Sequence, residues 1–154
     1  LSIRRQRQMC IRDSDYSELS VKSSEKLNSK NILCNKAKIL QASVSDMPFD
    51  DNTFDNITAV ETYYFWPDKE NDVKEVFRVL KQGGTVMLLF EMLRTDDDPF
   101  KWEKVENMLN IKSVTPQEIR AVLESAGFEN INTYTKEGTT WLCATAQKPK
   151  DDEN

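Results

Sequence analysis

The stretch from Ser43 to Gly84 constrains the fold more than any other part of this 154-residue chain. It reads S-V-S-D-M-P-F-D-D-N-T-F-D-N-I-T-A-V-E-T, then an aromatic run, and later E-V-F-R-V-L-K-Q-G-G. The apolar run from Asn56 to Glu61 is typical of a buried parallel strand. Four later apolar residues share one face at helical spacing: Val73, Val76, Phe77 and Leu80. A strand, an amphipathic helix and a Gly-Gly turn are half of an α/β repeat, so an α/β fold is predicted.

Capping signals locate further elements. Ser17 is a suitable N-cap for a helix to about Asn31, and Asp68 is one for the amphipathic helix, which Gly83-Gly84 is expected to end. Thr115 to Glu118 is a capping box with proline at the first helical position. Other runs predict strands at 38–41 and 85–91, a helix near 100–110, a terminal antiparallel hairpin from 131–135 and 140–146, and a solvated polar tail at 148–154.

The order D-x-P-F, then D-x-x-F-D before an apolar strand, then R-V-L-K-x-G-G resembles the middle of class I S-adenosylmethionine-dependent methyltransferases. The resemblance covers about residues 15–147 and corresponds to the later two-thirds of such a domain. It implies a Rossmann-like methyltransferase sheet with a terminal antiparallel hairpin. The N-terminal strand and the cofactor-loop half would be missing, because none of the four glycines forms the G-x-G that lets a backbone approach a dinucleotide-like cofactor.

The first residues offer an explanation for that gap. Met9 to Asp13 back-translate as ATG TGT ATA AGA GAC, which resembles a transposon adapter used in sequencing libraries. We therefore expect residues 1–14 to be translated adapter rather than part of the fold, and the natural coding sequence to begin at about Asp15. The alternative is a basic arm that binds nucleic acid or membrane, which the arginines in this segment would favour.

The resemblance implies a cofactor site from several segments. Asp15 matches the acidic position at the end of the second strand of the family, which binds the ribose hydroxyls, and Tyr16 could pack on the adenine. Ser43 and Val44 match the adenine loop, where the serine hydroxyl and the valine amide could contact the base, although many relatives carry an acid at the serine position. The alternative is that Asp15 only caps or flanks the helix that follows.

Glu61 follows the predicted strand at the edge where ligands of open α/β sheets bind. It could face the methionine end of the cofactor, polarise an amine acceptor, or be a structural carboxylate. The aromatic run after it supplies Tyr63, Tyr64 and Trp66 as candidate walls of an acceptor pocket, with burial beneath the next helix as the alternative. No catalytic residue can be assigned from the sequence.

Composition narrows the function classes. Without residues 1–14, which hold four of the 21 basic but one of the 26 acidic residues, the net charge falls from −5 to about −8. Such a surface disfavours nucleic acid as a substrate, and no apolar run is long enough to cross a membrane. The chain has no histidine, which excludes Ser-His and Cys-His catalytic pairs. Its cysteines form neither a metal-ligand pattern nor a disulfide framework, so a cytoplasmic protein without a metal site is expected.

The predicted function is methyl transfer from S-adenosylmethionine to a small-molecule acceptor by the intact parent protein, of which this chain is an inactive fragment. A non-catalytic α/β interaction domain is the alternative, and a nicotinamide-dependent oxidoreductase fits the order of motifs less well. The sequence specifies neither the acceptor molecule, nor its methylated atom, nor the oligomeric state.

Overall fold

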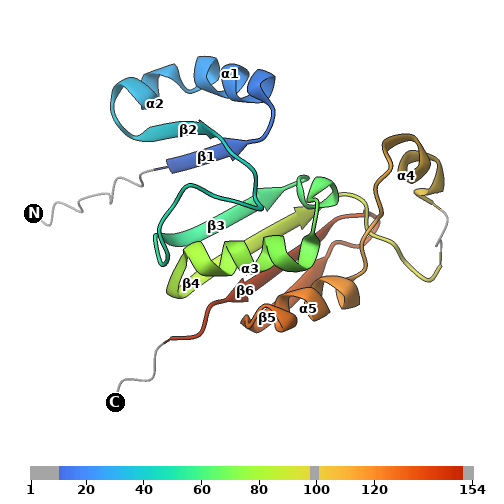
Figure 1. Cartoon of the computed structure of the whole chain (residues 1–154). Coiled ribbons are helices and arrows are strands. Elements are labelled where there is room, and N and C mark those ends of the chain that lie inside the picture. Colours follow the sequence, from blue (N-terminus) through green and yellow to red (C-terminus); the bar gives the residue numbers. More distant parts are fainter. Residues whose placement is uncertain (1–10, 98–100, 151–154) are drawn as a thin grey trace, which may run out of the picture. The chain divides into compact units, whose positions relative to one another are not determined.

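The computed structural model describes residues 11–97 and 101–150, and the chain divides into two compact units, residues 1–48 and residues 49–154 (Figure 1). In the first unit, the parallel strands β1 (Ile11–Asp15) and β2 (Ala37–Gln41) are joined by helices α1 (Glu18–Leu27) and α2 (Ser29–Leu33). Asp15 pairs with Gln41, so the carboxyl ends of both strands lie at one edge. This edge carries the four residues predicted to bind adenosine.

Ser17 begins α1 as predicted, and its hydroxyl accepts a hydrogen bond from the backbone of Ser20. The helix ends earlier than expected, at Leu27, and α2 follows after Asn28. Of the segment assigned to the adapter, residues 11–14 lie in β1, while residues 1–10 lie outside the described residues. The origin of these codons stays a prediction.

The second unit contains a four-stranded sheet in the order β3-β4-β6-β5, formed by β3 (Phe54–Val60), β4 (Leu80–Phe90), β6 (Leu142–Gln147) and β5 (Glu129–Thr135). β3 is parallel to β4, whereas β6 is antiparallel to both β4 and β5, which confirms the terminal hairpin. Helices α3 (Lys69–Val79) and α5 (Pro116–Ser125) cover one face (Figure 1). A short helix, α4 (Glu103–Leu109), precedes α5, and α5 begins with the predicted capping box.

The core of the second unit lies between this sheet face and the two helices. The inward side chains of β4 alternate with half-buried ones, as expected for a strand with one face packed against helices. Phe77 of α3 meets Phe128, just after α5, with ring centroids 5.0 Å apart. The side chains that are almost completely buried here include Val73, Val76, Val86, Leu88, Phe90, Ile119 and Leu123.

The prediction of a buried strand at residues 56–61 is wrong in its burial. β3 is parallel to β4, but none of its seven side chains is buried, and Val60 is 49% exposed. The reason is its position in the sheet. Among the described residues β3 pairs with β4 alone, so its other edge presents free backbone groups.

The prediction that Gly83-Gly84 ends the amphipathic helix is also wrong. α3 ends at Val79, because the fully buried Leu80 is already extended and pairs with Phe54 as the first residue of β4. The glycines lie in an irregularity of β4, where the register with β3 shifts. A Cβ on Gly84 would lie 2.4 Å from Leu80 Cδ2 and 2.8 Å from a backbone oxygen, so only glycine fits.

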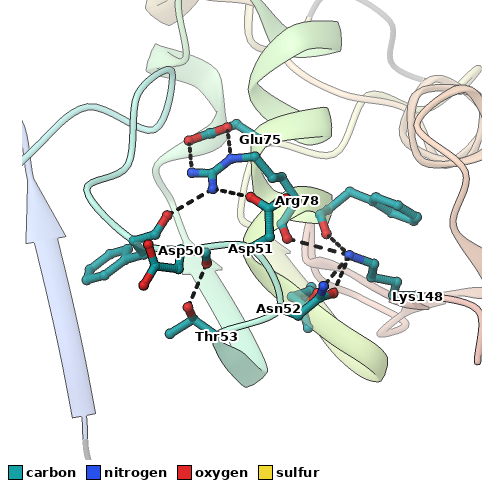
Figure 2. A network of polar contacts seen from close by, with 10 residues as sticks. Asp50, Asp51, Asn52, Thr53, Glu75, Arg78 and Lys148 are labelled. Carbon is teal, nitrogen blue, oxygen red and sulfur yellow. Dashed lines mark hydrogen bonds and ion pairs between the residues drawn. The ribbon is translucent and has the colours of Figure 1, made fainter.

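The predicted polar tail begins with a buried lysine. Lys148 is 6% exposed, and its ammonium group donates hydrogen bonds to Phe77 O and Leu80 O at 2.8 Å and to Asn52 Oδ1 at 2.9 Å (Figure 2). The error has a clear cause: the inward alternation of β6 continues two residues past Ala146, which places Lys148 on the core side. Its charge lies at the C-terminus of α3, where helix carbonyls lack partners.

Arg78 fixes the same region from the helix side. Its guanidinium group pairs with both carboxylate oxygens of Glu75 at 2.7 Å, with Asp51 at 2.6 Å and with the carbonyl of Phe49 at 2.9 Å (Figure 2). Together with Lys148, these contacts bind the turn before β3 to the end of α3. The turn is thereby held at the end of the sheet opposite to the carboxyl ends of β3 and β4.

Candidate functional site

The carboxyl ends of β3 and β4 lie side by side and place Glu61 next to the start of the loop after β4. The backbone N–H of Glu61 donates to Leu89 O at 3.0 Å, so the ladder with β4 continues one residue beyond β3. Glu91 follows directly after β4. Because parallel strands end at the same edge, two carboxylates from distant parts of the sequence come together here.

Glu61 departs from ordinary backbone geometry. Its φ is 58°, in the left-handed region that costs a residue with a side chain about 1–2 kcal/mol. Its Oε1 atom is buried and has no hydrogen-bond partner among the residues that the structure describes. Burial raises the pKa of the Glu61 carboxyl, a hydrogen bond from the Glu91 backbone lowers it, and the charge of Glu91 raises it further. A strained backbone and an unpartnered buried oxygen in one residue are typical of a binding site.

Tyr64 connects the loop after β3 to the loop after β4. Its hydroxyl oxygen accepts a hydrogen bond from the backbone N–H of Met92 at 2.8 Å. Burial is the main cause that raises the pKa of Tyr64 to about 12, so this hydroxyl is neutral at physiological pH. Tyr64 therefore holds the two strand ends in a fixed relation without adding charge.

The predicted acceptor-pocket aromatics lie mostly inside the core. Tyr63, Tyr64 and Trp66 are 5%, 4% and 9% exposed, and the rings of both tyrosines pack edge-on against Phe90. Phe65, which was not among the predicted site residues, is 50% exposed. The three buried rings pack in the core near the strand ends, and their contact with an acceptor stays a prediction.

Asp72 is a buried acid that sequence reasoning missed. It is fully buried in the first turn of α3, where its Oδ2 accepts from the backbone of Asp68 at 3.0 Å. Its Oδ1 has no partner within residues 11–97 and 101–150. The only signal in the sequence is that this acid lies directly beside Val73, at the start of the apolar helix face. That signal is weak, because the helix dipole favours an acid in the first turn whether or not it is buried. Asp72 thus fixes the end of the loop that begins at Glu61.

In the first unit, the edge formed by β1 and β2 brings the predicted adenosine-binding residues together. Asp15 Oδ1 accepts from the backbone of Ser17 at 2.7 Å, and the carbonyl of Asp15 accepts from Ala42 at 3.1 Å. Ser43 lies directly after this pairing, and its hydroxyl accepts from Ser45 at 3.2 Å. Tyr16 is 73% exposed, so its ring is accessible to a ligand.

The family model described as "Methyltransferase domain" matches residues 4–88, which is more than half of the chain, so the chain belongs to this methyltransferase family. Two relatives illustrate how similar the chain is to known methyltransferases and how much of each protein it covers. The chain is 29% identical over 147 residues to the uncharacterized methyltransferase YdaC of Bacillus subtilis (strain 168), covering 92% of this chain and 76% of that protein. It is 32% identical over 136 residues to the ubiquinone/menaquinone biosynthesis C-methyltransferase UbiE of Cronobacter sakazakii, covering 74% of this chain but 54% of UbiE.

Solved structures agree on the fold. A SAM-dependent methyltransferase from Aquifex aeolicus has a TM-score of 0.68 and 20% identity, covering 88% of this chain and 67% of that one. The [4+2]-cyclase SpnF has a TM-score of 0.79 and 16% identity, covering 92% of this chain and 67% of SpnF. The predicted Rossmann-like methyltransferase fold is therefore confirmed. Because a cyclase shares this fold, the fold alone does not specify the reaction.

The family implies S-adenosylmethionine as the cofactor, and the residues of the first unit fit its adenosine part. Asp15 uses Oδ1 for Ser17, which leaves Oδ2 without a protein donor in the part of the chain that the structure describes. A free carboxylate oxygen at a parallel strand end suits a ribose hydroxyl. The sequence contains no G-x-G loop for the rest of the cofactor.

Proposed function

We propose that the intact protein transfers a methyl group from S-adenosylmethionine to a small-molecule acceptor. Membership of a methyltransferase family supports this proposal, and the observation that carries it for this chain is the placement of Asp15 at the same strand edge as Ser43 and Val44. In the proposal, Asp15 accepts from the ribose hydroxyls, Ser43 and Val44 contact the adenine, and Tyr16 packs against it. The proposal assigns contact with the acceptor to Tyr63, Tyr64 and Trp66, and contact with the methionine end of the cofactor or with the acceptor to Glu61.

Bound S-adenosylmethionine supplies a methyl group already activated on a sulfonium sulfur, so the protein needs mainly to bind, orient and exclude water. Asp15 orients the cofactor through its ribose. Tyr64 holds the loops after β3 and β4 together through its hydrogen bond with the Met92 backbone. The proposal requires no metal ion. The proposal also places the protein in the cytoplasm. It includes neither nucleic acid nor a membrane as a partner.

The proposal includes the fragment character of this chain. The open edge of β3 and its exposed Val60 support it, because a strand of this apolar composition is normally paired on both sides. We expect residues 15–154 alone to fold poorly. A cooperative thermal transition of a monomeric, soluble preparation of those residues would contradict this expectation.

No helix within the described ranges 11–97 and 101–150 has the length and apolarity needed to span a membrane.

Cofactor binding by the intact protein tests the proposal. The genomic region upstream of the codon for Asp15 is first read with adapter-free long reads, and the whole encoded protein is titrated with S-adenosylhomocysteine by calorimetry. Replacing Asp15 with asparagine removes a charged acceptor, which is expected to weaken binding about tenfold, equivalent to about 1.4 kcal/mol. The matched control is Glu25→Gln, at an exposed position of α1 in the same unit.

Two results would count against methyl transfer. Absence of S-adenosylhomocysteine binding by the intact protein would favour the non-catalytic interaction domain. A native start near Asp15, with no strand and glycine loop upstream, would have the same meaning because the cofactor site would then be incomplete.

A further inference from the structure

The buried oxygen of Glu61 needs a hydrogen-bond donor that the described part of the chain does not provide. Oε1 has no partner, and no ion pair in the described ranges involves Glu61. A buried polar group without a partner costs about 1–3 kcal/mol, and more when it is charged. A bound molecule that donates to Oε1 would recover this free energy.

The surroundings of Glu61 specify the charge of that donor. Glu91, after β4, acts on Glu61 through its backbone hydrogen bond and its charge, and Glu61 in turn acts on Tyr64, in the loop after β3. Glu91 adds negative charge, and Tyr64 is neutral because the pKa of its hydroxyl is raised to about 12. This strand-end group, made of Glu61, Glu91 and Tyr64, therefore has an excess of negative charge. A neutral hydroxyl donor would leave that charge uncompensated, whereas a protonated nitrogen would neutralise part of it.

The backbone supports a role beyond folding. Glu61 is one of five residues other than glycine with a positive φ in the described ranges, and the other four are asparagines. Asparagine adopts this conformation more readily than glutamate because its short side chain can bond locally. The fold alone would thus favour asparagine or glycine at position 61, and a glutamate occupies it against this preference.

We propose that the Glu61 carboxylate binds the protonated nitrogen of an amine and accepts one of its protons, and that the neutral amine so formed is the methyl acceptor. Its lone pair would form the new N–C bond as the bond from the methyl carbon to the sulfonium sulfur breaks, with S-adenosylhomocysteine as the leaving group. This inference rests on the proposed function and names its substrate class. Oε1 accepts the N–H hydrogen bond, Glu91 adds long-range attraction, and Tyr64 keeps Glu61 in place through its bond to the Met92 backbone. A protonated nitrogen could also come from the amino group of the cofactor, so the test separates these two sources.

The test is a calorimetric titration of the intact protein with benzylamine and with its neutral isostere benzyl alcohol, with and without S-adenosylhomocysteine. We expect wild-type protein to bind benzylamine about tenfold more tightly than benzyl alcohol. This ratio of dissociation constants corresponds to the gain from one charge-assisted hydrogen bond. Glu61→Gln should abolish this preference, and Glu129→Gln, at an exposed position on β5, should keep it. Near-ultraviolet circular dichroism verifies that both variants retain the packing of the tryptophans.

Three outcomes would overturn the inference: equal affinity for the two probes, absence of binding by either, or a benzylamine preference that persists in Glu61→Gln. A second arm compares S-adenosylhomocysteine with an analogue that lacks its amino group. If Glu61→Gln removes the difference between those two compounds and leaves the benzylamine preference unchanged, the nitrogen belongs to the cofactor and the acceptor assignment is wrong. Failure of the proposed function is recognised separately, because S-adenosylhomocysteine then does not bind, while the titration without it still reports on Glu61.

Discussion

Replacing Lys148 with methionine should destabilise the second unit by about 3 kcal/mol. The substitution keeps the length and apolar stem of the side chain but removes the ammonium group that donates to Phe77 O, Leu80 O and Asn52 Oδ1 within 2.9 Å (Figure 2). The ring of Phe77 also loses a cation, which lies 4.6 Å from its centroid. No other part of the fold needs to change.

The magnitude follows from two opposing effects. Three oxygen atoms lose a charged donor, and each stranded acceptor costs at least about 1 kcal/mol. The variant no longer needs to bury an ammonium group, which recovers several kcal/mol of desolvation, but the lysine contacts already offset that cost in the native protein. The net loss of about 3 kcal/mol therefore takes the lower value for each acceptor.

The assay is urea unfolding of the intact protein, monitored by tryptophan fluorescence, to which the buried Trp66 contributes. Lys150→Met is the matched control: the same substitution two residues away, at an exposed position, should change the free energy of unfolding by less than about 0.5 kcal/mol. If Lys148→Met is as stable as Lys150→Met, the contacts of Lys148 merely balance its desolvation, and the proposed anchoring of α3 is refuted.

Three further predictions concern the strand ends and the glycine pair. Since the folded state raises the pKa of Glu61, the wild type loses stability as the pH rises through that raised value. Glu61→Gln should therefore increase the urea midpoint at pH 7 and leave it unchanged at about pH 3, where both side chains are neutral; an equal effect at both pH values would contradict the buried charge. The pKa values of Tyr63 and Tyr64 are about 12, so the native state keeps protons that the unfolded chain loses above about pH 10, and stability should fall between these values. When both tyrosines are replaced with phenylalanine, the free energy of unfolding should fall less steeply with pH in this range. If the pH profile of the variant equals that of the wild type, the two tyrosines do not cause the alkaline loss of stability. Gly84→Ala places a Cβ against Leu80 and two backbone oxygens, which should cost more than about 2 kcal/mol in urea unfolding, whereas an alanine tolerated without loss would show that β4 can straighten there.

Local signals in the sequence predicted most elements correctly. The capping box at Thr115 and the N-caps Ser17 and Asp68 are all formed, because capping depends on side chains within a few residues of the helix start. The terminal hairpin was equally predictable from period-two alternation around Gly138. The same alternation would have placed Lys148 inward, had it been continued past Ala146.

The site was predictable in its location but not in its details. A residue after an apolar strand lies at the ligand-binding edge of an α/β sheet, which suffices to select Glu61 and the neighbouring aromatic residues. No local pattern indicates that the Glu61 backbone is left-handed, that its Oε1 is buried, or that Tyr64 reaches Met92. These features depend on the meeting of β3 and β4, which are separated by the whole of α3.

The sequence by itself determined the α/β class, the order of helices and strands, the methyltransferase resemblance and the residues at the strand ends. These properties follow from short-range spacing of apolar, capping and turn residues, which any local stretch of chain carries. Only the tertiary structure decided which strand is left with an open edge, which charges are buried and which polar atoms lack a partner. Those properties depend on groups distant in sequence: Lys148 is buried because the end of α3 presents carbonyls to it, and the charge of Glu91 acts on Glu61 because β3 and β4 end side by side.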